Sequence, residues 1–280
     1  MKLPPVTFLV GPYTRATLAL NAAVRDRRAH MAEAGLTAFP SRTASPVARA
    51  LALGEGSLAE REAAFDAAVG LDADGGGPVL LSSLNALGAP VQAISGRDLF
   101  PEMGAFFAGL ARTRYAGARI VVGVEPLTLF FASAGTEALA KRVSNTPWEV
   151  LYELSWAELL RDIRALCPEA ELLVVTPEAS VARAGEVLDT IFGPAAAATH
   201  ARGLQNAHLS VEGQAVLQTF DAAGAGENVL TDILSRLGSG PSDDELEARF
   251  GIDRLTATLL DQRFAEDVAA LSRMDGVHLL

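Results

Sequence analysis

Short apolar runs alternate with longer helix-like segments over the first two thirds of the chain. The runs are VTFLV at 6–10, VLLSS at 79–83, ARIVVGV at 118–124 and AELLVVT at 170–176. Continuous apolar runs of this length are typical of strands buried on both faces of a parallel sheet. Because strands and helices alternate, the sequence predicts an α/β fold with a doubly wound, mostly parallel sheet.

Helices are expected wherever apolar residues recur at helical spacing beside cap residues. The segments that meet this condition between the predicted strands are 15–33, 58–71, 103–115, 127–142, 155–166 and 180–192. After Gly193 we expect no further strand, a loop over 193–208, and helices at 210–222, 227–237, 242–250 and 253–274. The chain 1–280 is therefore predicted to be a single domain in which 194–280 forms a mainly helical C-terminal cap.

The composition limits the classes of partner. Half of the residues are hydrophobic, enough for a sizeable core, and the formal net charge is −11. An acidic surface repels nucleic acid and anionic lipid, so neither is expected as a partner. The chain has no run of about 20 apolar residues and its start lacks a signal-peptide pattern. We therefore expect a soluble, cytoplasmic protein with no membrane span.

The single cysteine, Cys167, rules out an internal disulfide and a cysteine-rich zinc site. It is expected to be a buried thiol at the end of a helix. The four histidines show no metal-ligand spacing, so no metal is expected. His208 is either a general base on a loop near the strand ends or, more simply, a surface histidine beside a helix. Trp148 and Trp156 are expected to be core or interface anchors.

The segment FLVGPYTRATLAL at 8–20 places Gly11-Pro12 between the first strand and the first helix. Such a turn directs unpaired backbone N–H groups and the positive end of the helix dipole at one point, where an anion binds well. Residues 11–17 are therefore the candidate anion-binding loop. Arg15 either adds a bidentate anion contact or is a solvated side chain, and Tyr13 either contacts a ligand or packs in the fold.

Several stretches resemble the bacterial sulfotransferase-like P-loop proteins. That family opens with a strand and a pattern close to G-P-H-K-T-G-T-T-x-L-Q, and this chain has GPYTRATLALN at 11–21. The likeness continues in AGL at 34–36, FP at 39–40, SSL at 82–84, VEP at 124–126 followed by Ser133, SWAELL at 155–160, ELLVV at 171–175 and the C-terminal stretch ARFGIDRLTATLLDQRFAEDVAALSRMDGV. The resemblance covers most of the chain and implies a P-loop fold of the sulfotransferase type.

The likeness is weakest where the family has its charged groups. The position of the loop lysine is Thr14, and that of the loop glycine is Ala16. Glu125, or Val124 before it, stands where the family has an arginine for the cofactor's 3′-phosphate. Leu84 stands in place of the glutamate that is the candidate base. The sequence thus predicts a degenerate sulfotransferase site.

The resemblance implies transfer of a sulfuryl group from 3′-phosphoadenosine 5′-phosphosulfate to a hydroxyl or amine acceptor, with no catalytic base identified. The residues that it assigns to the cofactor are Gly11, Pro12, Tyr13, Thr14, Arg15, Ala16, Thr17 and Ser133. The alternative is a non-catalytic binding or assembly protein on the same scaffold, with a small molecule or a protein as its partner. A nucleotide kinase is disfavoured because the chain lacks a Walker sequence.

Overall fold

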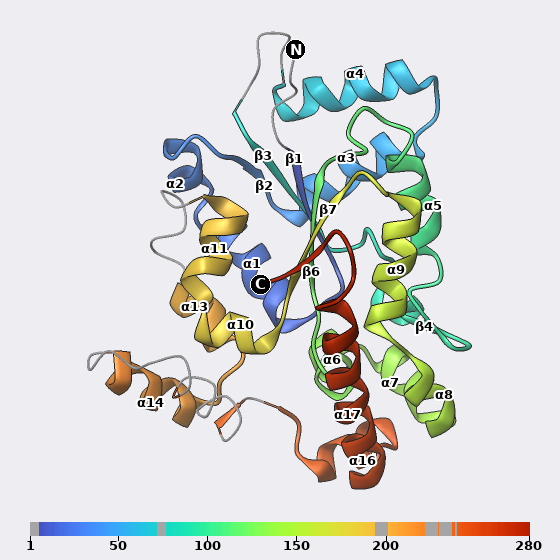
Figure 1. Cartoon of the computed structure of the whole chain (residues 1–280), viewed down its shortest axis with the longest axis vertical. Coiled ribbons are helices and arrows are strands. Elements are labelled where there is room, and N and C mark those ends of the chain that lie inside the picture. Colours follow the sequence, from blue (N-terminus) through green and yellow to red (C-terminus); the bar gives the residue numbers. More distant parts are fainter. Residues whose placement is uncertain (1–5, 72–76, 194–200, 222–228, 230–236, 239) are drawn as a thin grey trace.

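The structure is a computed structural model that describes residues 6–71, 77–193, 201–221, 229, 237–238 and 240–280. Within these residues, six strands form a parallel sheet in the order β2-β3-β1-β6-β7-β8. Helices cover both of its faces (Figure 1). The chain is therefore an α/β protein with a central parallel sheet, as the alternation of strands and helices predicted.

The four predicted strands are confirmed and lie side by side in the middle of the sheet. They are β1 (Val6–Val10), β3 (Val79–Ser83), β6 (Arg119–Gly123) and β7 (Glu171–Val175). Every residue of β1 and β3 is buried. Burial on both faces explains why these strands appear in the sequence as continuous apolar runs.

Two strands that the sequence did not predict form the edges of the sheet. They are β2 (Thr37–Phe39), which pairs with β3, and β8 (Val277–Leu279), which pairs with β7. The expectation that no strand follows Gly193 is wrong, because β8 belongs to the sheet. Each edge strand has three residues, and those of β8 are partly exposed, so neither produces an apolar run.

One face of the sheet is covered by two groups of helices, one within residues 15–33 and the other within residues 177–206. These are α1 (Arg15–Asp26), α2 (Arg28–Glu33), α10 (Pro177–Ala182), α11 (Ala184–Phe192) and α13 (Ala201–Asn206). In Figure 1, α1, α11 and α13 lie together on one side of the strands. Their apolar side chains form one core with the strands, which includes Leu9, Leu20, Val24, Met31, Val121, Leu188 and Leu204.

The opposite face carries a larger core that is rich in aromatic rings, including Phe106, Phe107, Phe130, Phe131 and Trp156. The helices that build it are α3 (Ser41–Leu53), α4 (Leu58–Val69), α5 (Met103–Leu110), α6 (Leu127–Ala134), α7 (Glu137–Ser144), α8 (Trp148–Glu153), α9 (Trp156–Leu166), α16 (Asp243–Phe250) and α17 (Arg254–Leu271). The C-terminal segment therefore adds helices to this face as well as β8 to the sheet edge. The hairpin of β4 (Ile94–Ser95) and β5 (Asp98–Leu99) adds Ile94 and Leu99 to this core. The remaining described elements are the short 3-10 helix η1 (Pro90–Gln92) and α14 (Val211–Asp221).

Three segments predicted as single helices are each divided in two. The interruptions fall at Arg27, at residues 135–136 and at Arg183. Gly135 has a φ of 59°, a left-handed conformation that ends α6 and that glycine adopts without strain. The predicted helix over 103–115 ends at Leu110, and the remaining predicted helices in described residues agree within a few positions.

Three further α-helices, α3, α8 and α13, were not predicted. α3 contains Pro46, a residue that normally ends a helix. α13 lies in the predicted loop 193–208, of which 194–200 fall outside the described residues. The helix predicted over 227–237 also falls largely outside them.

The sheet changes its winding direction between β1 and β6. From β1 the chain continues to β2 at one edge, and from β6 it continues to β7 toward the other edge, although β1 and β6 are neighbours. In an open parallel sheet the crevice at such a point, beyond the carboxyl ends of the strands, is where ligands usually bind. Residues 11–14 follow β1 and residues 124–126 follow β6, so both segments lie at this end of the two strands.

Candidate functional site

The loop after β1 bends directly into α1, as the sequence predicted. The N–H of Gly11 donates to the carbonyl of Ser83 at 3.2 Å. A Cβ atom at Gly11 would lie 2.0 Å from the carbonyl oxygen of Leu84, so no other residue fits there without a shift of the backbone. Thr14 is the N-cap of α1, and its hydroxyl accepts the N–H of Thr17 at 3.3 Å.

The neighbouring strand β6 approaches this turn very closely at Gly123. A Cβ atom there would lie 2.5 Å from Oγ1 of Thr14 and 2.6 Å from Oγ1 of Thr17. The two threonine hydroxyls are hydrogen-bonded to each other at 2.9 Å and both side chains are buried. The glycine therefore allows the carboxyl end of β6 to pack against the first turn of α1.

This packing brings Glu125, two residues beyond β6, to the N-terminus of α1. Its Oε1 accepts the backbone N–H of Arg15 at 3.3 Å, and its Oε2 accepts Nε of the same arginine at 3.0 Å. The Glu125 side chain is fully buried, and that of Arg15 is 15% exposed. A carboxylate thus lies at the position where the helix dipole and a guanidinium both attract an anion.

Opposing effects act on the pKa of the Glu125 carboxyl group. Burial raises the pKa of its carboxyl group, whereas the charge and the N–H donors of Arg15 act against this rise. Ser133, on α6, is within reach of the carboxyl group, and its hydroxyl also opposes the rise in pKa. Both carboxyl oxygens accept N–H donors, which is the arrangement that an ionised carboxylate requires.

The backbone of Glu125 is held from the other side of the sheet. The indole Nε1 of Trp156 donates to the Glu125 carbonyl at 2.8 Å, and the Trp156 side chain is buried in the aromatic core. Pro126, the N-cap of α6, follows at once. The expectation of an anchoring role is confirmed for Trp156, whereas Trp148 is 48% exposed and is not a core residue.

His208 lies close enough to Arg15 for its charge to act on the ring. It is fully buried, so the expectation of a surface histidine is wrong. Burial, together with the positive charge of Arg15, lowers the pKa of His208 to about 3. Within the part of the chain that the structure describes, neither ring nitrogen has a hydrogen-bond partner. A neutral imidazole therefore borders the arginine.

The other predicted site residues have structural partners. Pro12 and Ala16 are buried, and the hydroxyl of Tyr13 donates to Oδ1 of Asn85 at 2.6 Å. Of the predicted set, Arg15 and Ser133 interact with Glu125, and Thr14 and Thr17 lie against Gly123. Cys167 is a buried helix-end thiol as expected, and burial raises its pKa to about 11.

Sequence reasoning named Glu125 but did not recognise its partner. Glu125 was considered only as the residue at the position of the family's phosphate-binding arginine. Two features of the sequence could have indicated the pair: a cation in the first turn of α1 and a carboxylate just after β6. Both positions lie at the switch point of the sheet. Leu84, the counterpart of the candidate base, is buried and has no group that accepts a proton.

The residues at this site do not fit the phosphosulfate group of the expected cofactor. The Arg15 N–H and its Nε already bind Glu125, and the Thr17 N–H is used by Thr14. A phosphate at the same place would meet a buried negative charge. The described residues also contain no group of three or more histidine, cysteine, aspartate or glutamate side chains that could hold a metal ion.

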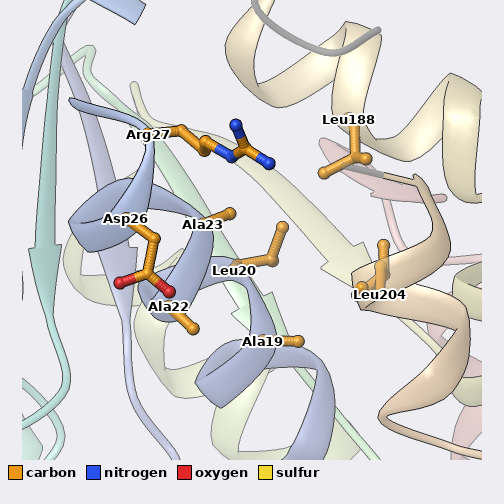
Figure 2. Close-up of a pocket in the computed structure, with 9 residues that line it drawn as sticks. Ala19, Leu20, Ala22, Ala23, Asp26, Arg27, Leu188 and Leu204 are labelled. Carbon is orange, nitrogen blue, oxygen red and sulfur yellow. The ribbon is translucent and has the colours of Figure 1, made fainter. Parts of the chain in front are cut away.

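Arg15 and Ser133 line a cavity of about 390 Å³. Two further cavities lie nearby. One, of about 820 Å³, opens at the carboxyl end of β3, and Ser83 and Asn85 line it. The other, of about 300 Å³, lies between α1 and the helices α11 and α13. Figure 2 shows its apolar floor of Leu20, Leu188 and Leu204, with Arg27 extending over it. The lining of this smaller cavity includes no residue of the loop 11–17, so the cavity is separate from the loop.

Comparisons of the chain with protein-family models, with curated proteins and with solved structures find no match. Among the described helices, none has both the length and the apolar content that crossing a bilayer requires. The site must therefore be interpreted from its own geometry.

Proposed function

We propose that this chain is a non-catalytic binding protein on a sulfotransferase-like α/β scaffold. One observation carries the proposal: the fully buried carboxylate of Glu125 binds both the N–H and the Nε of Arg15. The anion-attracting end of α1 thus has an anion supplied by the chain itself. The absence of a proton acceptor at Leu84 and of a lysine at Thr14 supports the same proposal.

An external phosphate could bind only by displacing Glu125. Displacement would separate a buried ion pair, and the loss of one partner from such a pair costs about 3–5 kcal/mol. The displaced carboxylate would also need a new location within a closely packed region, since Trp156 holds its backbone and the side chain is fully buried. Glu125 therefore competes directly with a nucleotide phosphate.

A sulfotransferase with an altered site remains the second candidate. The observation in its favour is that Arg15 and Ser133 interact with Glu125, while Thr14 and Thr17 lie against Gly123 two residues earlier. This candidate requires that Glu125 moves away when 3′-phosphoadenosine 5′-phosphosulfate binds. It also requires a proton acceptor from the acceptor substrate or from elsewhere in the chain.

Titration calorimetry with 3′-phosphoadenosine 5′-phosphate separates the two candidates. The proposal expects no detectable binding to the natural chain at submillimolar nucleotide. Submillimolar binding that weakens in the double variant Arg15→Gln/Glu125→Gln would overturn it in favour of the sulfotransferase. The double variant is preferred to Arg15→Ala because it leaves no buried carboxylate without its cation. Unfolding in urea shows whether the variant is folded.

A further inference from the structure

A cavity opens at the carboxyl end of β3, beside the loop. Its volume is about 820 Å³, within the range of pockets that enclose small organic ligands. Ser83 at its base pairs in register with Val10 of β1, so the cavity lies one strand away from the Arg15–Glu125 pair. The hydrogen bond between Tyr13 and Asn85 stands at the boundary between the two regions.

The walls of the cavity combine an apolar surface with few polar groups. α3 contributes Pro46 and Leu53, α5 contributes Phe106, and the segment after β3 contributes Leu87. Leu53 is 41% exposed, so part of this wall is open. Such walls favour the apolar body of a ligand.

The charged groups at the cavity differ in their partners. Oε2 of Glu102 accepts Nε2 of Gln92 at 2.8 Å, and Oε1 of Gln92 accepts the N–H of Ala89. Arg49 is exposed, and no ion pair within the described part of the chain involves it. Arg49 is therefore the cation at this cavity that an anionic ligand can pair with, whereas Glu102 is an anion hydrogen-bonded to a neutral amide.

One neutral donor accompanies Arg49. Oδ1 of Asn85 accepts the Tyr13 hydroxyl at 2.6 Å, which leaves the Asn85 amide N–H₂ as the group that can donate to a ligand. The hydroxyl of Ser83, deeper in the cavity, donates to Ser45 at 3.4 Å. The groups available at the cavity are thus N–H donors on a partly apolar surface, which suits an anionic head on an apolar body.

From this arrangement we propose that the cavity binds a small organic anion, with its carboxylate at Arg49 and Asn85 and its apolar body between Leu53 and Phe106. This inference rests on the proposed binding function and names the class of its ligand. It does not require that the α1 N-terminus accept an anion. The claim about the α1 N-terminus and the inference about the cavity can therefore fail independently.

The test is titration calorimetry of the full chain with 2-naphthoate, and with the neutral 2-naphthamide as the second arm. The natural chain should bind the carboxylate at least tenfold more tightly than the amide. Arg49→Gln should weaken 2-naphthoate about tenfold, a loss typical of one charge-assisted hydrogen bond. Arg42→Gln is the matched control, since Arg42 is an exposed arginine on α3 that does not line the cavity, and it should change the affinity less than twofold.

A second variant tests the cavity rather than the charge. Ala105 is exposed on α5 and lines the cavity, so Ala105→Trp fills the space from a position outside the core. It should abolish binding of 2-naphthoate while the urea midpoint stays within the range of the control. Absence of binding by the natural chain, equal affinities for the acid and the amide, or equal losses in Arg49→Gln and Arg42→Gln would each overturn the inference.

Discussion

At the scale of single residues, the candidate site is built around one ion pair. Arg15 lies in the first turn of α1 and Glu125 just beyond β6, and 110 positions separate them in the sequence. A buried pair of this kind adds little net stability, because both charges leave water. The removal of one partner, however, leaves the other charge buried and unpaired. The pair therefore makes each residue dependent on the other.

Double-mutant analysis of this pair gives the first prediction. Arg15→Gln should lower the free energy of unfolding by about 3 kcal/mol or more, because the buried carboxylate loses its cation. Arg15→Gln/Glu125→Gln should lose less than the sum of the two single variants, with a coupling of about 1–3 kcal/mol. Urea unfolding at pH 7 measures all four proteins. Strictly additive losses would show that the two side chains do not interact.

Gly123 gives the second prediction. Gly123→Ala should destabilise the fold by about 1–3 kcal/mol, because the new methyl group would overlap the buried hydroxyls of Thr14 and Thr17. Gly185→Ala is the control, since nothing lies within 4 Å of a Cβ atom at this helical position. It should be neutral or stabilise by up to about 1 kcal/mol. Thermal unfolding of the two variants would contradict the account if their effects were equal.

At the scale of elements, α17 is joined to α9 by a buried side-chain cap. Oδ1 of Asp267, on α17, accepts the hydroxyl of Ser155 at 2.6 Å, and Oδ2 accepts the N–H of Trp156 at 2.7 Å. Burial raises the pKa of Asp267, and these donors oppose that rise. The C-terminal helix thus holds the first turn of α9 and, through Trp156, the backbone of Glu125.

Asp267→Ala tests this connection. It leaves the N–H of Trp156 buried without an acceptor, so the free energy of unfolding should fall by about 2 kcal/mol or more. Asp253→Ala removes an exposed N-cap from the same helix and should cost about 1 kcal/mol. Hydrogen exchange should show faster opening at the start of α9 in Asp267→Ala alone. Equal exchange in both variants would contradict the proposed link.

The sequence predicts the central elements better than the edges. β1, β3, β6 and β7 are apolar runs because they are buried on both faces. By contrast, β8 has three partly exposed residues and is stabilised by its pairing with β7, a long-range contact that leaves no local pattern. α3 was not predicted, and it contains Pro46.

Some features of the site follow from residues that are neighbours in the sequence, whereas others depend on contacts between distant segments. The bend into α1 and the N-cap position of Thr14 follow from residues 10–17, so local patterns predict them. The pairing of Arg15 with Glu125 depends on the position of β6 beside β1. The burial of His208 depends on how a later segment packs near Arg15. Neither the pairing nor the burial can be predicted from a short stretch of sequence.

At the scale of the whole molecule, three segments that are distant in the sequence meet at the charge of Arg15. Arg15 comes from the first helix, Glu125 from the middle of the chain, and His208 from the segment after α13. The two cores on opposite faces of the sheet fix these segments. The stability of the fold therefore responds to the protonation of groups that meet at the switch point.

The pH dependence of stability tests this convergence. The pKa of His208 is about 3 in the fold, whereas an unfolded histidine has a pKa near 6.5. The unfolded chain therefore binds a proton that the native chain does not, and stability is lost as the pH falls from about 6.5 toward 3. Between pH 7.5 and 5.0 this histidine should contribute a loss of about 2 kcal/mol.

Urea unfolding of the natural chain and of His208→Met at both pH values measures this contribution. Because all other groups titrate in both proteins, the difference between their pH dependences isolates the imidazole. The natural chain should lose about 2 kcal/mol more than the variant on acidification. Identical losses would show that His208 is able to take up a proton in the folded state.

The central claim is that Glu125 fills the anion-attracting end of α1. A crystal structure of the natural chain, grown with millimolar 3′-phosphoadenosine 5′-phosphate, tests it most directly. The account predicts electron density for the Glu125 carboxylate at the N–H and Nε of Arg15, with no phosphate between residues 11 and 17. A phosphate bound to that loop, with Glu125 turned away from Arg15, would contradict it.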